Sequence, residues 1–280
     1  MIFEFIVLGL AVAHAVIAPL TYWKIMGWYD FYIPIVIFIG TYILGLLLVI
    51  VFLLFAGLFS KWLLKKYPHN KLFTYRARFF LKQALVLINI HCNVSVRDKG
   101  LGKIPRNERF LLVCNHVSNF DPMVTINHLT RYEVDFITKP ENMKIPVAGN
   151  FLQALNFLAI NREDRMQSLQ VMQEAIKLIS EDICSIGVYP EGTRGHKKEM
   201  LPFHEGVFTI ALKAHCPIVI VTVKNTDKIR KRAPFKHTTV YHDIVNVIPY
   251  EEIEGQTPKA VSDLVRSIME NNLRRYERNG

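Results

Sequence analysis

The feature that most constrains this chain is a long uncharged apolar run near its N-terminus. From Phe31 to Ser60 the sequence contains no Asp, Glu, Lys, Arg or His, and the run is longer than the ~20 residues with which an α-helix crosses a bilayer. A second, nearly uncharged run extends from Phe5 to Trp23. Because only a few residues separate the runs, we expect residues 1–60 to form a transmembrane helical hairpin. A cleaved signal peptide fits poorly, because Glu4 stands where such peptides are basic.

The charges that follow predict how this hairpin is oriented. Residues 61–82 contain no Asp or Glu and are rich in lysine and arginine. Basic residues beside a span favour the cytoplasmic side. We therefore expect an integral membrane protein whose remaining chain lies on the cytoplasmic face of the cell membrane, or of an internal membrane if the source is eukaryotic. The basic residues are Lys61, Lys65, Lys66, Lys71, Arg76, Arg78 and Lys82.

The net charge points to an anionic partner. The chain carries +10, and residues 1–60 hold Lys24 against Glu4 and Asp30, which leaves +11 for residues 61–280. The sequence has no zinc-ligand spacing, recognition helix or aromatic-basic RNA motif, so we expect membrane lipids and not nucleic acid. Residues 61–90 are expected to form a basic amphipathic helix at the membrane interface. The alternative is a core helix with a basic flank.

The cysteine pattern indicates neither a disulfide framework nor a metal site. The four cysteines stand singly in apolar surroundings, without a CxxC pair. We expect reduced, buried thiols, no bound metal and no cofactor. The residues are Cys92, Cys114, Cys184 and Cys216.

Residues 91–280 alternate between strand-like and helical patterns. Short apolar runs predict strands, and apolar positions that recur with helical spacing predict helices between them. This alternation predicts an α/β domain, with a mostly parallel or mixed sheet flanked by helices. The expected strands are Phe110–Cys114, Val134–Thr138, Ser185–Tyr189, Ile218–Val223 and Thr239–Ile248.

Two helices have the clearest patterns. The first is Arg165–Ser180, and the second begins after Thr257 as the N-cap residue, with Pro258 at its first position. We expect the first to bury Leu169, Met172, Ile176 and Ile179, and the second to bury Val261, Leu264, Val265 and Ile268.

A histidine and an aspartate follow the first strand of the series. Asn115-His116 comes directly after Phe110–Cys114, and Asp121 precedes Pro122. At the carboxyl edge of a sheet, an imidazole can take a proton from an alcohol while a carboxylate orients the ring. The nucleophile would then be a hydroxyl of the substrate. The alternative is purely structural, with Asp121 as a helix N-cap and Asn115-His116 as a turn.

A second polar group ends another predicted strand. In Glu191-Gly192-Thr193-Arg194 the glycine allows a ligand to approach the backbone closely, and Arg194 offers a forked donor for phosphate oxygens. Glu191 could hold that fork by pairing with a neighbouring base. The alternative is a solvated polar turn.

Together, and in this order, these groups resemble the glycerolipid acyltransferase family. Asn115-His116 with Asp121 is followed some seventy residues later by Glu191-Gly192-Thr193-Arg194. The resemblance extends over roughly residues 85–250, and Ile220 departs from it, where the family usually has a second proline. Features between and beyond the two groups also fit: Lys139 with Pro146 and Gly149, Arg162 after Asn156, Phe203 with Gly206, and Pro217-Ile-Val.

The resemblance implies an enzyme that moves a fatty acyl group from an acyl thioester to the sn-2 hydroxyl of lysophosphatidic acid. His116 is then the general base and Asp121 its partner. Arg162, Glu191, Gly192, Thr193 and Arg194 are implied to bind the phosphate and glycerol of the acceptor, with Lys139 as a weaker phosphate candidate. The donor is acyl-CoA or acyl carrier protein.

Several alternatives to this activity stay open. The acceptor could be glycerol-3-phosphate, another lysophospholipid or a lyso-aminolipid, and water as the acceptor would make the chain a thioester hydrolase. A non-catalytic protein that binds anionic lipid would explain the apolar runs and basic charge, but neither polar group. Lys224–Lys236 is expected to be a solvated basic loop, with attraction of acidic carrier protein or lipid headgroups as the alternative.

Overall fold

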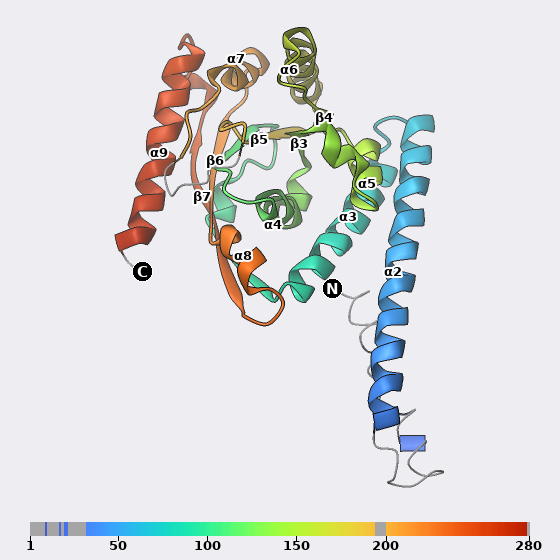
Figure 1. Ribbon diagram of the computed structural model, residues 1–280. Coiled ribbons are helices and arrows are strands. Elements are labelled where there is room, and N and C mark those ends of the chain that lie inside the picture. The colour runs from blue at the N-terminus through green and yellow to red at the C-terminus, as the bar shows by residue number, and fades with distance from the viewer. Residues whose placement is uncertain (1–8, 10–16, 18–19, 22–31, 194–199, 279–280) are drawn as a thin grey trace. The chain divides into compact units, whose positions relative to one another are not determined.

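The computed structural model describes residues 9, 17, 20–21, 32–193 and 200–278, which divide into two compact units (Figure 1). The first unit contains the chain up to Leu87 together with Pro146–Ala154, and the second contains Ile88–Ile145 and the chain from Leu155 onward. The sequence-based boundaries at residues 60 and 90 stay predictions.

The first unit is built on α2, a 35-residue helix over Tyr32–Lys66. Within the described residues, only its Ile35–Lys66 portion is long and apolar enough to cross a membrane. The helix continues beyond the apolar run to Lys65 and Lys66 in its last turn. The predicted first span, Phe5–Trp23, lies almost wholly outside the described residues, so the hairpin stays a prediction.

Two further helices contact α2 within this unit. The short helix α5, Ala148–Ala154, packs closely at Gly57, where a Cβ would lie 3.0 Å from Cβ of Asn150. The ammonium group of Lys61 donates to the side-chain amide oxygen of Gln153 at 2.6 Å. Helix α3, Lys71–His91, meets α2 edge-to-face through Phe80 and Phe52, with ring centroids 5.6 Å apart.

The helix expected over residues 61–90 is divided in the structure, because residues 61–66 belong to α2 and α3 begins at Lys71. Helix α3 is neither purely a membrane-interface helix nor purely a core helix. Ala77 and Leu81 are buried, whereas Tyr75 and Phe79 are exposed together with the basic Arg76.

The second unit contains a mixed seven-stranded sheet with the order β1-β7-β6-β2-β5-β3-β4. All neighbouring strands run parallel except the antiparallel pair β6 and β7. This confirms an α/β fold with a mixed sheet flanked by helices. The strands are β1 Val94–Lys99, β2 Leu111–Cys114, β3 Val134–Thr138, β4 Leu158–Ala159, β5 Ser185–Val188, β6 Ile218–Lys224 and β7 Thr238–Ile248.

The five predicted strands are all present, with ends that differ by at most one residue. Strands β2 and β5 are buried along their whole length, and β6 is buried except at Lys224. Parallel strands covered on both faces read as continuous apolar runs, which is why the sequence revealed them. The two strands missed are the edge strands: β1, with alternating burial, and the two-residue β4.

Helices cover both faces of the sheet. Figure 1 shows α6 and α7 on the opposite side of the sheet from α4 and α8. The helices are α4 Phe120–Leu129, α6 Arg165–Ser180, α7 Thr209–Ala214, α8 Thr226–Arg232 and α9 Pro258–Arg278. Short 3-10 turns lie at Leu101–Lys103, Thr130–Tyr132, Pro140–Lys144, Glu205–Phe208 and Tyr250–Glu252.

The limits of α6 and the start of α9 were predicted correctly, and the buried face of α6 was predicted in part, since Ile179 is buried and Met172 and Ile176 pack against the core. Its buried side chains are Val171, Ala175, Leu178 and Ile179, whereas Leu169 is 52% exposed. The buried face thus includes Val171, Ala175 and Leu178, next to the predicted residues on the helix surface. Ala175 was missed because a small side chain is enough to fill the space where a helix lies close to the sheet.

In α9 the amide of Ala260 donates to the Thr257 hydroxyl at 3.2 Å, which confirms the predicted cap. Val261 and Val265 are buried as expected, and Met269 replaces the 38% exposed Leu264.

All four cysteines are free. Cys114, Cys184 and Cys216 are buried and Cys92 is half-buried. Burial raises the pKa of the Cys216 thiol to about 12, so the prediction of reduced, unreactive thiols fits their surroundings.

Because Gly187 in β5 has no side chain, an aromatic ring on the neighbouring strand β3 can lie directly against its backbone. Gly187 pairs with Phe136, and a Cβ on Gly187 would lie 2.3 Å from that ring. We predict that Gly187→Ala lowers the free energy of unfolding by about 1–3 kcal/mol, because the ring must leave its position. Thermal unfolding in detergent measures this change.

The matched control is Gly102→Ala, because a Cβ on Gly102 meets no atom within 4 Å. Equal melting temperatures for the two variants would contradict the packing of Phe136.

Candidate active site

His116 and Asp121 lie between β2 and the first turn of α4. Their side chains meet with His116 Nδ1 2.9 Å from Asp121 Oδ2. Asp121 is fully buried, whereas the His116 side chain is 17% exposed. The ring therefore stands at the surface with a buried carboxylate behind it, as the proton-abstraction hypothesis requires.

The Asp121 carboxylate also organises the turn before α4. Its Oδ2 accepts hydrogen bonds from the backbone amides of Val117 and Ser118, both at 2.7 Å. Both amides precede Asp121, and Asn119 occupies the N-cap position of α4, so the alternative of Asp121 as the N-cap residue is wrong. The same carboxylate oxygen nonetheless contacts His116 and holds the turn before the helix.

The other carboxylate oxygen is bound from a distant part of the chain. Asp121 Oδ1 accepts a short hydrogen bond from the hydroxyl of Thr226, the fully buried first residue of α8. The amide side chain of Asn115 likewise bridges to β6, accepting from the amide of Val223 at 2.7 Å and donating to its carbonyl at 3.0 Å. The end of β6 is therefore joined to the His116 turn.

The partner of Nδ1 fixes the tautomer of His116. Asp121 accepts a proton and does not donate one, so we assign the proton to Nδ1 of the neutral ring. Within the described chain, Nε2 has no hydrogen-bond partner. The ring packs against Tyr189 with centroids 4.6 Å apart, and Tyr189 in turn stacks on Phe136 at 5.6 Å. Nε2 is thus the nitrogen available to accept a proton.

Glu191 joins the two polar groups of the sequence. One carboxylate oxygen accepts from the amide of His116 at 2.7 Å, and the other accepts from the amide of Leu201 at 2.9 Å. Burial raises the pKa of the Glu191 carboxyl, and these two hydrogen bonds oppose the increase. Within the described residues Glu191 binds backbone amides and holds the His116 turn. Its predicted pairing with a neighbouring base stays a prediction.

Gly192 has a left-handed backbone with φ of 70°. A Cβ there would lie 2.6 Å from the His204 ring and 3.4 Å from Cζ of Arg162. The predicted binding residues Arg162 and Gly192 are therefore close neighbours. Thr193 follows in the turn and is exposed, while the predicted Arg194 lies outside the described residues.

The parallel register places most of these residues at one edge of the sheet. His116 follows β2, Glu191 follows β5 and Lys139 follows β3, and these strands run parallel. Lys139 is exposed. This is the carboxyl edge, at which open α/β sheets bind their ligands.

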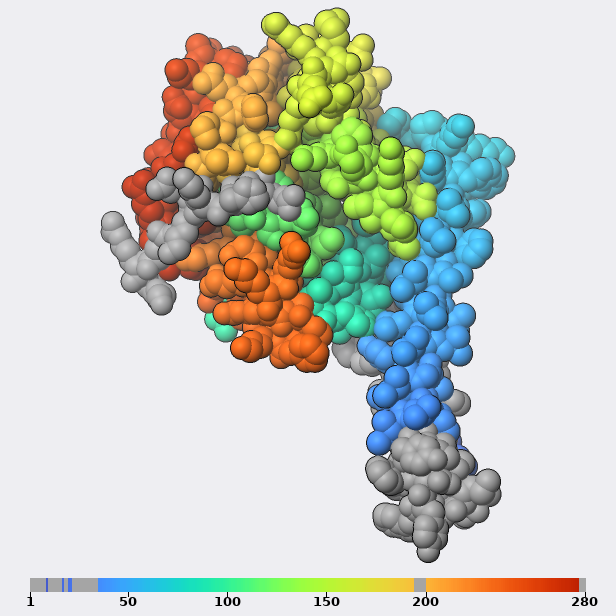
Figure 2. All heavy atoms as spheres, viewed as in Figure 1, coloured from blue at the N-terminus to red at the C-terminus, as the bar shows by residue number. Residues whose placement is uncertain are grey.

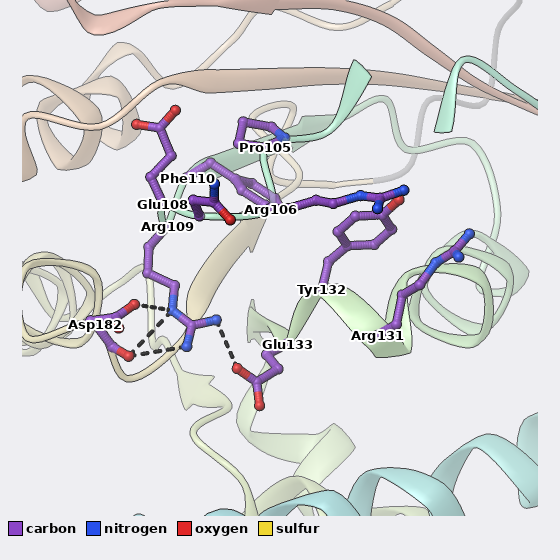
Figure 3. Close-up of a pocket in the computed structure, with 10 residues that line it drawn as sticks. Pro105, Arg106, Glu108, Arg109, Phe110, Arg131, Tyr132, Glu133 and Asp182 are labelled. Carbon is purple, nitrogen blue, oxygen red and sulfur yellow. Dashed lines mark hydrogen bonds and ion pairs between the residues drawn. The ribbon is translucent and has the colours of Figure 1, made fainter. Parts of the chain in front are cut away.

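A pocket of about 530 Å³ lies at the opposite edge (Figure 3). It is lined by residues that precede β2, β3 and β5, among them Arg109, Glu133 and Asp182. The guanidinium group of Arg109 forms ion pairs with both acidic residues: Nη1 lies 2.8 Å from Oε2 of Glu133, and Nε lies 2.7 Å from Oδ1 of Asp182. None of the predicted site residues lines this pocket.

Sequence reasoning missed Thr226 and classed its segment wrongly. Lys224–Lys236 was expected to be a solvated loop, but it contains α8, in which Thr226 and Ile229 are fully buried. The available signal was a polar residue at the end of a buried strand, the same signal that revealed His116 and Glu191.

Comparisons with known proteins match this chain to acyltransferases. The model of the family described as Acyltransferase matches residues 95–224. The 1-acyl-sn-glycerol-3-phosphate acyltransferase of Haemophilus influenzae is 29% identical over 166 residues, which cover 58% of this chain and 68% of the relative. The human alpha enzyme of that name is 29% identical, with 68% and 67% covered, and the mouse alpha enzyme is 28% identical, with 62% and 61% covered.

A solved structure has the same fold. The crystal structure of the 1-acyl-sn-glycerophosphate (LPA) acyltransferase from Thermotoga maritima matches with a TM-score of 0.60 and 21% identity, covering 82% of this chain and 95% of that one.

A second carboxylate anchors the far end of α4. Asp98 in β1 accepts from Nδ1 of His128 in α4 at 2.6 Å and from Nδ1 of His242 in β7 at 2.8 Å. Burial of Asp98 raises its pKa, but the two histidines outweigh this and hold the pKa well below its usual range. Helix α4, whose first turn contains Asp121, is thereby joined to β1 and β7.

We predict that Asp98→Asn lowers the free energy of unfolding by roughly 0.5–1.5 kcal/mol near neutral pH. A carboxyl whose pKa is depressed in the folded state stabilises it fully above the unfolded-state value of ~3.9, and this contribution declines as the pH falls below that value. The difference between parent and variant should therefore shrink at acidic pH, as measured by thermal unfolding across pH. Asp263→Asn, at an exposed position of α9, is the control; a difference independent of pH would contradict the ionised Asp98.

Proposed function

We propose that this chain transfers a fatty acyl group from an acyl thioester to the sn-2 hydroxyl of 1-acyl-sn-glycerol-3-phosphate, forming phosphatidic acid. The observation that carries the proposal is the contact of His116 Nδ1 with the buried Asp121 carboxylate, which leaves Nε2 to act as a base. The Haemophilus influenzae and human relatives, which match over 58% and 68% of this chain, are both named as acyltransferases of 1-acyl-sn-glycerol-3-phosphate.

In the proposed mechanism Nε2 of His116 removes the proton of the acceptor hydroxyl as its oxygen attacks the thioester carbonyl. The Asp121 carboxylate stabilises the imidazolium that forms. Collapse of the tetrahedral intermediate breaks the carbon–sulfur bond, and the departing thiolate takes the proton from His116. An ester forms, a thiol leaves, and the base is restored without an acyl-enzyme.

The acceptor phosphate would bind at the turn that contains Gly192. Arg162 lies beside that turn, and a guanidinium fork suits phosphate oxygens. We propose that Thr193 and Arg194 complete this subsite, with Lys139 at the end of the neighbouring strand. Glu191 contributes as a positioning residue, because its bonds join this turn to the amide of His116.

The cellular setting is part of the proposal. Helix α2 is a candidate membrane span, and Lys65 and Lys66 stand in its last turn. We propose an integral membrane enzyme whose acyltransferase domain faces the cytoplasm, where membrane lipids supply lysophosphatidic acid and either acyl-CoA or acyl carrier protein supplies the acyl group.

We predict that His116→Ala lowers acyl transfer to lysophosphatidic acid by about 10²–10⁴-fold, the usual contribution of a general base. Phosphatidic acid is measured with purified protein in detergent or nanodiscs, with acyl-CoA and acyl carrier protein tested separately as donors. His215→Asn, at an exposed position after α7, is the matched control and should retain activity. Near-parental transfer by His116→Ala would refute the assignment of the base.

We predict that Thr226→Val lowers kcat about tenfold with little change in the acceptor KM, which corresponds to a loss of about 1.4 kcal/mol in the transition state. Valine keeps the shape of the buried side chain but removes the donor to Asp121. A carboxylate with one donor fewer attracts the His116 proton more strongly, so the acidic limb of the pH–rate profile should move to higher pH.

Thr226→Ser keeps the hydroxyl and should restore both kcat and the pH profile. If the serine and valine variants behave alike, the hydroxyl has no positioning role.

A further inference from the structure

A basic segment with one protruding aromatic residue follows β6 at the carboxyl edge of the sheet. This segment, Thr226–His237, consists of α8 and the link to β7. It contains five basic residues and the acidic Asp227, which gives a net charge of 5 − 1 = +4. The basic residues are Lys228, Arg230, Lys231, Arg232 and Lys236. Figure 2 shows the segment in orange at the surface of the molecule.

Two residues of the segment are buried in the domain, and its basic side chains are exposed. Thr226 and Ile229 are fully buried, whereas all five basic residues are exposed. In the described part of the chain, no ion pair involves any of the five. The positive charge is therefore available to an external anionic partner.

Phe235 adds an apolar group to this surface. It is 92% exposed, more than any other large apolar side chain in the described residues. Lys236 follows it, and Arg232 lies three residues before it. An aromatic ring among cations is the composition with which proteins enter the headgroup region of anionic membranes.

We propose that Thr226–His237 is a docking surface for an anionic lipid bilayer, in which the basic side chains bind headgroup phosphates and the Phe235 ring inserts at the boundary with the acyl chains. A bilayer fits better than a protein, because a single protruding ring needs a soft apolar phase and not a shaped pocket. Helix α2, which is long and apolar enough to cross a membrane, is a second feature of the described chain that fits a bilayer as the partner.

Docking there would bring lipid to the catalytic edge of the sheet. The hydroxyl of Thr226, the first residue of the segment, donates to Asp121, which in turn contacts His116. The proposal concerns membrane contact itself and does not require the activity proposed above.

The test is the environment of a fluorophore at position 235. NBD is attached to Phe235→Cys in a Cys92→Ser background, because the other three cysteines are buried. The full-length protein is placed in nanodiscs of phosphatidylcholine alone, or of phosphatidylcholine and phosphatidylglycerol in equal parts. We expect blue-shifted, brighter emission and protection from aqueous quencher with phosphatidylglycerol, and a smaller response without it.

Two controls make the test specific. NBD at Glu254→Cys reports on the opposite edge, because β7 runs antiparallel to β6 and the exposed Glu254 follows its far end; this label should stay aqueous. Changing Lys228, Arg230 and Arg232 to Gln should reduce the response to phosphatidylglycerol at position 235 about tenfold or more, since each basic residue near such a surface contributes about fivefold.

Emission at position 235 that matches the Glu254 control in both nanodiscs would overturn the proposal. Protection that appears only when acidic acyl carrier protein is added would also overturn it, in favour of a protein partner. Because fluorescence does not depend on turnover, a failed acyl-transfer assay would leave this result unaffected.

Discussion

The buried carboxylate of Asp121 is the interaction on which the rest of the site depends. Its two oxygens accept from the His116 ring, from two backbone amides of the turn before α4 and from the Thr226 hydroxyl. A buried charge without partners would cost several kcal/mol, so the fold supplies donors from three directions. Those same donors fix the orientation of His116, and this is how the stability of the carboxylate and the readiness of the base arise from one arrangement.

The parallel sheet makes this convergence possible. Strands β2, β5 and β6 lie side by side and their buried cores are apolar, so the first polar residues after each strand gather at one edge. His116, Glu191 and Thr226 each follow a different strand. Glu191 binds the amide of His116, and Thr226 binds the partner of His116. The residue that follows β2 thus carries the imidazole itself, and the residues that follow β5 and β6 each support it.

Much of the fold could be predicted because burial leaves a local pattern. Strands buried on both faces appear as apolar runs, and the caps of α6 and α9 appear as Asp164 and Thr257. Edge strand β1 was missed because only one neighbour pairs with it and four of its six residues are polar or charged. In α6, Leu169 was assigned to the buried face wrongly and Ala175 was missed, because the spacing of large apolar residues does not reveal a close contact made by alanine.

The site was predictable where its residues are close in sequence or belong to a shared pattern. His116 and Asp121 are five residues apart and follow a strand, so both could be found. Thr226 contacts Asp121 across 105 residues of sequence, and this contact exists only because β6 lies next to β2, an order that no local pattern fixes. For the same reason, the bonds of Glu191 to backbone amides were visible only in three dimensions.

The central claim is that Asp121 holds His116 with the proton on Nδ1 and a free Nε2. Proton–nitrogen correlation NMR of histidine-labelled protein in nanodiscs, with His116 assigned through the His116→Ala variant, observes both ring nitrogens directly. In the neutral ring, the account predicts a slowly exchanging proton on Nδ1 and an unprotonated Nε2. A ring protonated on Nε2, with Nδ1 free, would contradict it.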